Sequence, residues 1–90
     1  MEFDWDNKKA AKNIKKHKIS FQEAASVFND ILAITFDDPD HSIGEHRLLT
    51  FGTTKTGKLL IVSHTEINGL MRIISARLMK THERKIYEEG

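Results

Sequence analysis

A β-hairpin signal constrains the fold of this chain more than any other feature. Two runs rich in β-forming residues, 59–65 and 70–77, flank the dipeptide Asn68-Gly69. Asn-Gly is favoured in two-residue hairpin turns because both turn positions need a positive φ. We therefore expect two antiparallel strands joined at these residues.

A two-residue turn also predicts which side chains of the hairpin lie together. It pairs Glu66 with Met71, His64 with Ile73 and Leu60 with Arg77. Because side chains alternate between faces, one face is predicted to carry His64, Glu66 and Arg77, and the other Thr65 and Arg72. A loop longer by one residue would exchange these partners. An imidazole and guanidinium groups on a rigid hairpin are the groups that an anion-binding site needs.

Composition limits the class of protein. Ninety residues are enough for one domain, and we expect residues 1–90 to form it. The chain has no cysteine, which excludes disulfides and cysteine-based zinc sites and fits a reducing cytoplasm. The N-terminus, MEFDWD, lacks the layout of a signal peptide, and no apolar run approaches the ~20 residues of a membrane span. We therefore expect a soluble cytoplasmic protein.

Charge is distributed unevenly along the chain. Residues 8–18 contain six lysines and no acid, whereas residues 30–45 contain five acids and no lysine or arginine. Such separation indicates one surface for a polyanion and another for a basic partner. The alternative is two solvated faces that differ only in the sign of their charge.

Two helices are predicted in the first third of the chain, after a short extended start at residues 3–5. Asp6 is a suitable N-cap for a helix that runs to about Lys18, with an inward stripe at Ala10, Ala11, Ile14 and His17. Ser20 begins a capping box for a second helix, whose core face is Phe21, Ala24, Ala25 and Phe28.

The remaining elements complete an α+β fold. Strands are expected at residues 31–36 and 45–51, before the hairpin, and a final helix with Thr81 as its cap follows Arg77. The predicted order is β-α-α-β-β-β-β-α. We expect two helices on one face of an antiparallel sheet of four to five strands, with a C-terminal helix returning to it.

Several polar residues are candidates for chemistry. His64 lies between Ser63 and Thr65, but no nucleophile-elbow sequence accompanies them, so a serine hydrolase is not indicated. Arg77 closes an apolar strand, which predicts either solvent exposure or an anionic partner. Glu45 and Arg47 are either an ion pair or a general acid or base beside a phosphate-binding arginine.

Two further groups have alternative interpretations. Lys16 and His17 end the basic helix, as part of a solvated face or as contacts for a phosphate backbone. The loop Asp37-Asp38-Pro39-Asp40-His41 resembles a metal site, but its spacing matches no EF-hand or zincin, and turn chemistry explains it better. One tryptophan and one tyrosine provide no stacking platform for single-stranded RNA.

An ordered set of residues runs along almost the whole chain: Phe3-Asp4-Trp5-Asp6, Asn13, Lys16-His17, Ile19-Ser20-Phe21, Glu23-Ala24, Phe28, Phe36 to Ser42, Glu45, Arg47, His64-Thr65, Arg72 to Arg77, Glu83-Arg84 and Tyr87. In these residues the chain resembles the BrnT family. Lys18 departs from the pattern, because many members have glycine there to end the first helix.

The resemblance implies a RelE-like fold and a ribonuclease toxin of a type II toxin–antitoxin system. It also implies a BrnA-type antitoxin with a ribbon-helix-helix DNA-binding part, in a complex that represses its own operon. Metal-free RNA cleavage, in which the 2′-hydroxyl attacks the neighbouring phosphate, needs a base, an acid and positive charge. For such a nuclease we expect Glu45 and His64 as acid–base groups and Arg47 and Arg77 as phosphate-stabilising groups, with no cofactor or metal. Lys16, His17 and Arg72 are expected to position RNA. The alternatives are a non-catalytic module that binds nucleic acid or protein, and a metal-dependent nuclease that uses Asp37, Asp38 and Asp40.

Overall fold

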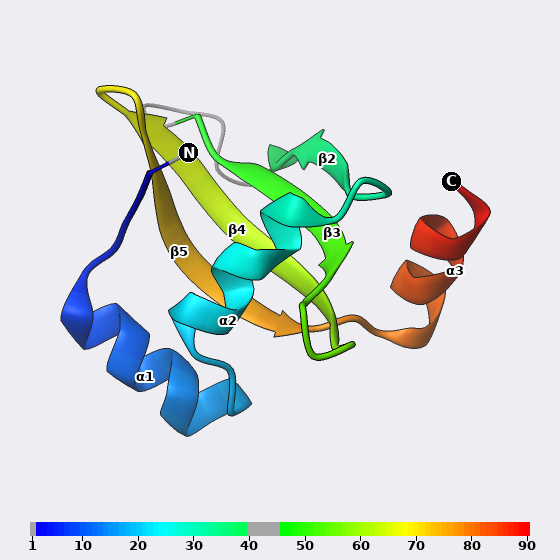
Figure 1. The fold of residues 1–90 in the computed structure, drawn as a ribbon, viewed down its shortest axis with the longest axis horizontal. Coiled ribbons are helices and arrows are strands. Elements are labelled where there is room, and N and C mark those ends of the chain that lie inside the picture. Colours follow the sequence, from blue (N-terminus) through cyan, green and yellow to red (C-terminus); the bar gives the residue numbers. More distant parts are fainter. Residues whose placement is uncertain (1, 40–45) are drawn as a thin grey trace.

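The computed structural model describes residues 2–39 and 46–90, which form an α+β fold in the predicted order. A five-stranded sheet has the strand order β1-β5-β4-β3-β2. The strands are β1 (Phe3–Asp4), β2 (Ile34–Asp37), β3 (Leu48–Thr53), β4 (Leu59–Ile67) and β5 (Leu70–Leu78). The helices are α1 (Asn7–His17), α2 (Phe21–Ala25), which continues as the 3-10 turn η1 (Ser26–Asn29), and α3 (Thr81–Glu89). Figure 1 shows α1 and α2 on one face of the sheet, and α3 apart from them at the other side of the molecule.

Four strands of the sheet are antiparallel, as expected, and the short fifth strand at its edge is parallel to its neighbour. Strands β2 to β5 are antiparallel, but β1 pairs with β5 in parallel, with Phe3 opposite Met71 and Asp4 opposite Arg72. The helices α1 and α2 and strands β2 to β4 separate β1 from β5 along the chain. With that much chain between them, either strand direction is accessible.

Helix α1 begins as predicted but faces the sheet differently. The Asp6 carboxylate accepts from the backbone N–H of Lys8 at 2.7 Å and of Lys9 at 3.2 Å, and Lys18 ends the helix with φ +62°. Ile14, expected in the inward stripe, is 47% exposed, and the buried residue is Asn13. Ala11 is exposed as well, so the predicted stripe is wrong at Ala11 and Ile14.

Asn13 faces inward because it hydrogen-bonds the edge of the sheet. Its amide nitrogen donates to the carbonyls of Ala76 and Ile19, both at 2.9 Å, and its oxygen accepts from Ala76 N–H at 3.1 Å. Buried backbone groups need such partners, so a polar residue replaces an apolar one at the contact between α1 and β5.

Helix α2 packs against the β4–β5 hairpin, and together they form the main hydrophobic core. Ser20 Oγ accepts from Glu23 N–H at 3.0 Å, as its capping role predicts. Phe21 and Ala24 are fully buried against Leu60, Val62, Ile73 and Ala76, while Ala25 and Phe28 are partly buried against the same cluster. Glu23 turns away from the cap and instead binds Lys58 Nζ at 3.1 Å and the hydroxyl of Thr56.

The observed boundaries of three elements differ from the predicted ones. Strand β2 begins at Ile34 rather than residue 31, because Asp30 Oδ1 accepts from Leu32 N–H and holds a turn there. Strand β3 begins at Leu48 and continues through Gly52 and Thr53, beyond its expected end at residue 51. Helix α3 has Lys80 as its N-cap, with Thr81 as its first residue.

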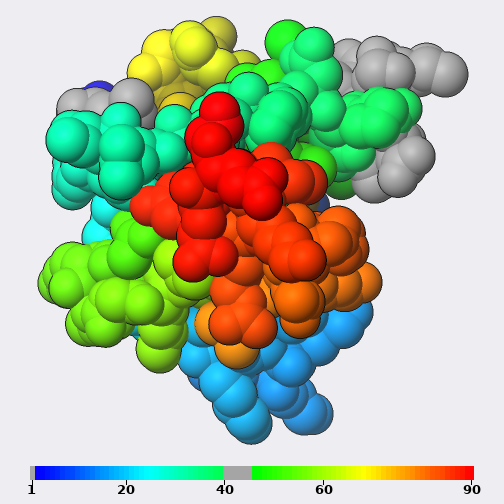
Figure 2. Space-filling view, turned by 90° about the vertical axis from the view of Figure 1, so that its right-hand side faces the viewer, coloured from blue at the N-terminus to red at the C-terminus, as the bar shows by residue number. Residues whose placement is uncertain are grey.

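Helix α3 packs over a second, smaller core formed by Phe51, Ile61 and Met79, with Tyr87 against it. The Tyr87 hydroxyl donates to Asp30 Oδ2 at 2.5 Å and lies 2.9 Å from Thr53 Oγ1. Figure 2 looks onto this side of the molecule, with α3 in red and orange at the centre. Within the described part of the chain, no helix has the length and apolarity to cross a membrane.

Candidate functional site

The hairpin turn forms as predicted, but a β-bulge changes the register beyond it. Asn68 and Gly69 have φ values of +52° and +82°, the signature of a two-residue turn. The pairs Glu66–Met71 and His64–Ile73 are as predicted. The next pair is Ser63–Ser75, so Ile74 is an extra residue in β5, and Arg77 lies opposite Ile61 rather than Leu60.

The bulge moves Arg77 to the opposite face from the one predicted. Arg77 shares its face with Ser75 and with Arg72, which pairs with Thr65. His64 lies on the other face, under α2 and η1. The prediction that His64 and Arg77 share a face is therefore wrong, because one inserted residue inverts the alternation.

His64 is buried, with 2% of its surface exposed. Its Nε2 lies 2.7 Å from Thr50 Oγ1, and the edge of its ring meets Phe28 with ring centroids 4.9 Å apart. Nδ1 is buried and finds no hydrogen-bonding partner in the described chain. Burial lowers the pKa of His64 to about 4, so the ring is neutral at pH 7. The acid–base role expected for His64 stays a prediction, and it would need RNA to reach a buried ring.

Arg77 is held by α3. Its Nη1 and Nη2 donate to Glu83 Oε1 and Oε2, both at 2.8 Å, and Glu83 Oε1 also accepts from Lys80 N–H at 2.8 Å. The hydrogen bonds from Arg77 lower the pKa of Glu83 to about 2. The same pairing raises the pKa of Arg77. About a third of the Arg77 side chain, 35%, remains exposed and available to an anion.

Arg72 and Arg47 lie toward the other end of the same face. Arg72 Nη1 donates to Asp4 Oδ2 at 2.6 Å. Thr65 Oγ1, on the strand opposite Arg72, donates to His46 C=O at 2.8 Å, and Arg47 follows His46. The Arg47 carbonyl accepts from Asp38 N–H at 3.0 Å, which extends the β2–β3 ladder by one residue. Alternation then places Arg47 on the face of Leu49 and Phe51.

The three arginines thus lie on one face of strands β3 to β5. Arg77 lies near one end of this face, and Arg72 and Arg47 lie toward the other end. Ile61, opposite Arg77, is four residues from Thr65, opposite Arg72. At the rise of a β-strand this separates the two positions by about 13 Å. We call this surface the arginine face.

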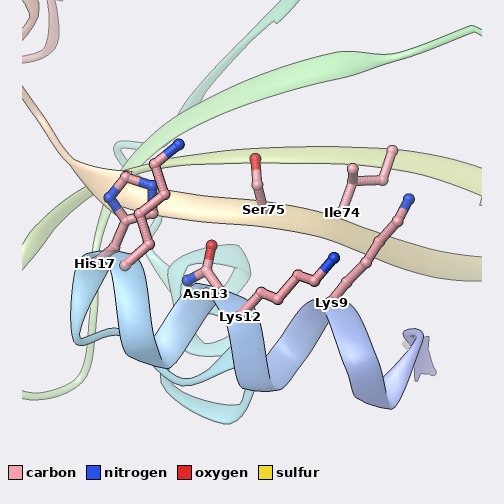
Figure 3. Close-up of a pocket in the computed structure, with 7 residues that line it drawn as sticks. Lys9, Lys12, Asn13, His17, Ile74 and Ser75 are labelled. Atoms are coloured by element: carbon pink, nitrogen blue, oxygen red, sulfur yellow. The ribbon is translucent and has the colours of Figure 1, made fainter.

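A basic groove adjoins the arginine face at the edge of β5. It has a volume of about 330 Å³ and is lined by Lys9, Lys12, Asn13, Lys16 and His17 of α1 and by Ile74 and Ser75 of β5. In Figure 3 the side chains of Lys9 and His17 rise from α1 toward β5. The structure therefore brings the two expected RNA-positioning residues of α1, Lys16 and His17, beside the bulge between Arg72 and Arg77.

Other predicted residues fall partly outside the described chain. Glu45, the expected acid–base partner of Arg47, lies outside residues 2–39 and 46–90, as do Asp40 and His41 of the acidic loop. Asp37, the first acid of that loop, lies 2.8 Å from His46 Nε2. Within the described residues, no cluster of three or more histidine and carboxylate side chains is arranged to hold a metal ion.

Sequence reasoning missed four residues that build the site. Asp4 and Glu83 hold the arginines, and their carboxylates come from distant parts of the chain. Lys9 and Lys12 line the basic groove with Lys16. The spacing 9, 12, 16 places side chains on one face of a helix, so helical periodicity applied to the lysines identifies this second pair.

Comparisons with known proteins agree with this architecture. Residues 5–83 match a family described as "Ribonuclease toxin, BrnT, of type II toxin-antitoxin system". Among solved structures, the chain is similar to the Brucella abortus ribonuclease toxin BrnT, with a TM-score of 0.71 and 25% sequence identity. The match covers 90% of this chain and 99% of the Brucella chain. A search of curated protein sequences gives no significant match.

Proposed function

The chain belongs to the BrnT family of ribonuclease toxins of type II toxin–antitoxin systems, and we propose that it cleaves RNA at the arginine face without a catalytic metal ion. The observation that carries the proposal is the bulge at Ile74, which puts Arg72 and Arg77 on one face with Arg47. Separate arginines on one face suit a chain of phosphates better than a single small anion.

Internal transesterification is the chemistry that these residues support. The RNA 2′-hydroxyl attacks the adjacent phosphorus, the 5′-oxygen leaves, and negative charge builds on the phosphorane between them. Guanidinium groups stabilise that charge by paired hydrogen bonds, the role we propose for Arg47 and Arg77. Because the attacking hydroxyl is absent from DNA, the reaction is specific for RNA.

Proton transfer needs an ionisable partner beside the arginines. We propose Glu45, two residues before Arg47, as the general base or acid. His64 is the second candidate from the sequence, but its burial and low pKa favour a structural role under Phe28 and Thr50. Variants at these two positions distinguish the assignments, because loss of the acting group lowers the cleavage rate without changing RNA affinity.

RNA binding is proposed to extend from the arginine face into the basic groove. Lys16 and His17 line that groove, and Arg72 lies on the adjoining face. Lysine contacts to phosphates add affinity without sequence preference, so this surface positions the strand rather than reads it.

Membership of a type II system implies a protein antitoxin. We propose that this antitoxin is of BrnA type, with a ribbon-helix-helix part that binds operator DNA, and that the complex represses its own operon. The toxin then acts on cytoplasmic RNA only when the antitoxin is removed.

The test uses purified wild type, Arg72→Ala and Asp4→Asn on a short RNA and its all-deoxy counterpart. Asp4→Asn removes the anionic partner of Arg72 but keeps the guanidinium, and so controls for the Asp4–Arg72 ion pair. We expect wild type to cleave only RNA, to leave 2′,3′-cyclic phosphate ends and to be insensitive to EDTA. The loss of cleavage activity in Arg72→Ala should be at least about ten times the loss in Asp4→Asn.

Three results would contradict the proposal. Intact RNA with folded wild type would indicate a non-catalytic binding module. Activity abolished by EDTA would indicate a metal-dependent nuclease. Equal losses in both variants would assign Arg72 to the structure of the β1–β5 edge.

A further inference from the structure

A second groove lies on the side of the molecule where β2 meets α3. It has a volume of about 370 Å³. Its aliphatic and aromatic lining is Leu32, Ile34, Phe36, Ile86 and Tyr87, and Glu88 and Glu89 line it at the end of α3. We call it the α3–β2 groove. Figure 2 faces this side, where α3 lies against the segment before and within β2.

Several apolar side chains of the groove are exposed to solvent. Leu32 is 67% exposed, Ile86 43% and Phe36 42%, and Ile31 beside them is 96% exposed. Apolar side chains gathered at one groove, rather than scattered singly, indicate a surface that another molecule covers. Phe36 is already oriented by Phe51, with ring centroids 5.2 Å apart, so part of the groove is preformed.

The backbone beside the groove offers a second recognition element. Strand β2 is the last strand of the sheet, and β3 is its neighbour in the described chain. At the opposite end of the sheet, β1 and the Asn13 side chain hydrogen-bond the edge of β5. An edge strand flanked by exposed apolar side chains is a template for an added strand from a partner.

Charge distinguishes this groove from the RNA surface. The lining of the α3–β2 groove includes two carboxylates and no lysine or arginine, whereas the basic groove of α1 includes three lysines and no carboxylate. Polyanions are therefore repelled from the α3–β2 groove and attracted to the other one. A protein segment with apolar and basic side chains is complementary to it.

We propose that the α3–β2 groove is the docking site for the antitoxin. An extended antitoxin segment pairs with β2, inserts apolar side chains between β2 and α3, and places basic side chains against Glu88 and Glu89. This inference rests on the proposed function only for the identity of the partner. Because α3 also carries Glu83, the bound antitoxin contacts the element that holds Arg77.

The test compares two isoleucines with the same exposure in different places. Ile86 in the groove is 43% exposed, and Ile67 at the hairpin is 42% exposed. Ile86→Asp and Ile67→Asp therefore introduce the same charge at similar accessible positions. Affinity of each purified variant for the purified antitoxin of the same module is measured by calorimetry, together with ribonuclease activity and melting temperature.

We expect Ile86→Asp to weaken antitoxin binding at least tenfold, and Ile67→Asp to leave it within twofold. Both should keep wild-type melting temperature and cleavage rate. The double variant Glu88→Lys/Glu89→Lys should also weaken binding, with a larger loss at low salt. Amide hydrogen exchange at residues 34–37 should slow when the antitoxin is bound.

Equal affinity of all variants for the antitoxin would overturn the inference. So would a parallel loss of ribonuclease activity in Ile86→Asp, which would assign the groove to the RNA site. A wild-type dimer that Ile86→Asp dissociates would identify a second copy of the toxin as the occupant instead. If wild type binds antitoxin but leaves RNA intact, the docking site stands and the proposed cleavage fails.

Discussion

Arg77 and Glu83 are joined by two parallel hydrogen bonds of 2.8 Å between the guanidinium and the carboxylate. The first residue is near the end of β5 and the second is in the first turn of α3, so the pair ties the helix to the sheet. It also fixes the direction of one guanidinium on the arginine face. An arginine already oriented by a carboxylate is prepared to meet a phosphate with its remaining donors.

Replacing each partner of this pair separates catalysis from stability. Arg77→Ala should lower RNA cleavage by about a hundredfold or more, because a donor aimed at developing charge is lost. Glu83→Gln keeps the guanidinium and should lower cleavage much less. Both variants lose the ion pair and should be destabilised by a similar amount, about 1–2 kcal/mol. Cleavage rates and urea unfolding measure the two effects. Equal cleavage by both variants would make Arg77 a structural residue.

The five lysines of α1 provide a matched test of RNA contact. Lys12 and Lys16 line the basic groove, whereas Lys8 and Lys15 are exposed residues outside its lining. Lys12→Gln/Lys16→Gln should weaken RNA binding and lower the slope of log affinity against log salt by about 1.4, the value for two phosphate contacts on single strands. Lys8→Gln/Lys15→Gln removes the same charge and should change the slope less. Identical slopes would mean that α1 acts through net charge alone.

The buried His64 should make folding stability depend on pH. Its folded pKa, about 4, lies below its ordinary value of 6.5, so the unfolded state takes up a proton first as pH falls. Stability from this group is complete above pH 6.5 and decreases between pH 6.5 and 4, with a loss of about 2 kcal/mol by pH 5. Urea unfolding from pH 7.5 to 4.5 measures the loss, and NMR titration identifies the residue. A His64 titration near pH 6.5 would exclude this origin.

Lys18 stores strain at the end of α1. Its φ of +62° is in the left-handed region, which favours glycine. Lys18 is also the position at which the sequence departs from the family pattern, where many members have glycine. Lys18→Gly should therefore stabilise the protein by about 0.5–1 kcal/mol. Lys15→Gly, in the last turn of the same helix, should destabilise it by about 1 kcal/mol, because glycine there costs only entropy. Chemical denaturation of both variants checks the opposite signs.

Local chemistry made much of the fold predictable. Asp6 and Ser20 cap their helices because each side chain binds a backbone N–H two or three residues away. The Asn68-Gly69 turn forms because both residues tolerate positive φ. The element order followed from these signals, which depend on short-range contacts alone.

The orientation of α1 was less predictable. Apolar periodicity favoured Ile14 as an inward residue, yet Asn13 is buried and Ile14 is exposed. Asn13 is the buried residue because the backbone of Ala76, at the edge of β5, needs hydrogen-bonding partners. That need appears only once helix and strand are packed together, so no pattern within the helix reports it.

The sequence by itself determined the hairpin, the N-caps of α1 and α2, the order of elements and the resemblance that the family match confirmed. Only the tertiary structure decided which side chains share a surface. One extra residue, Ile74, places Arg77 with Arg72 and separates it from His64. The same structure joins Arg77 to Glu83 and Arg72 to Asp4 across the fold. Side chains on a strand alternate with a period of two residues, so a single bulge reverses every face beyond it.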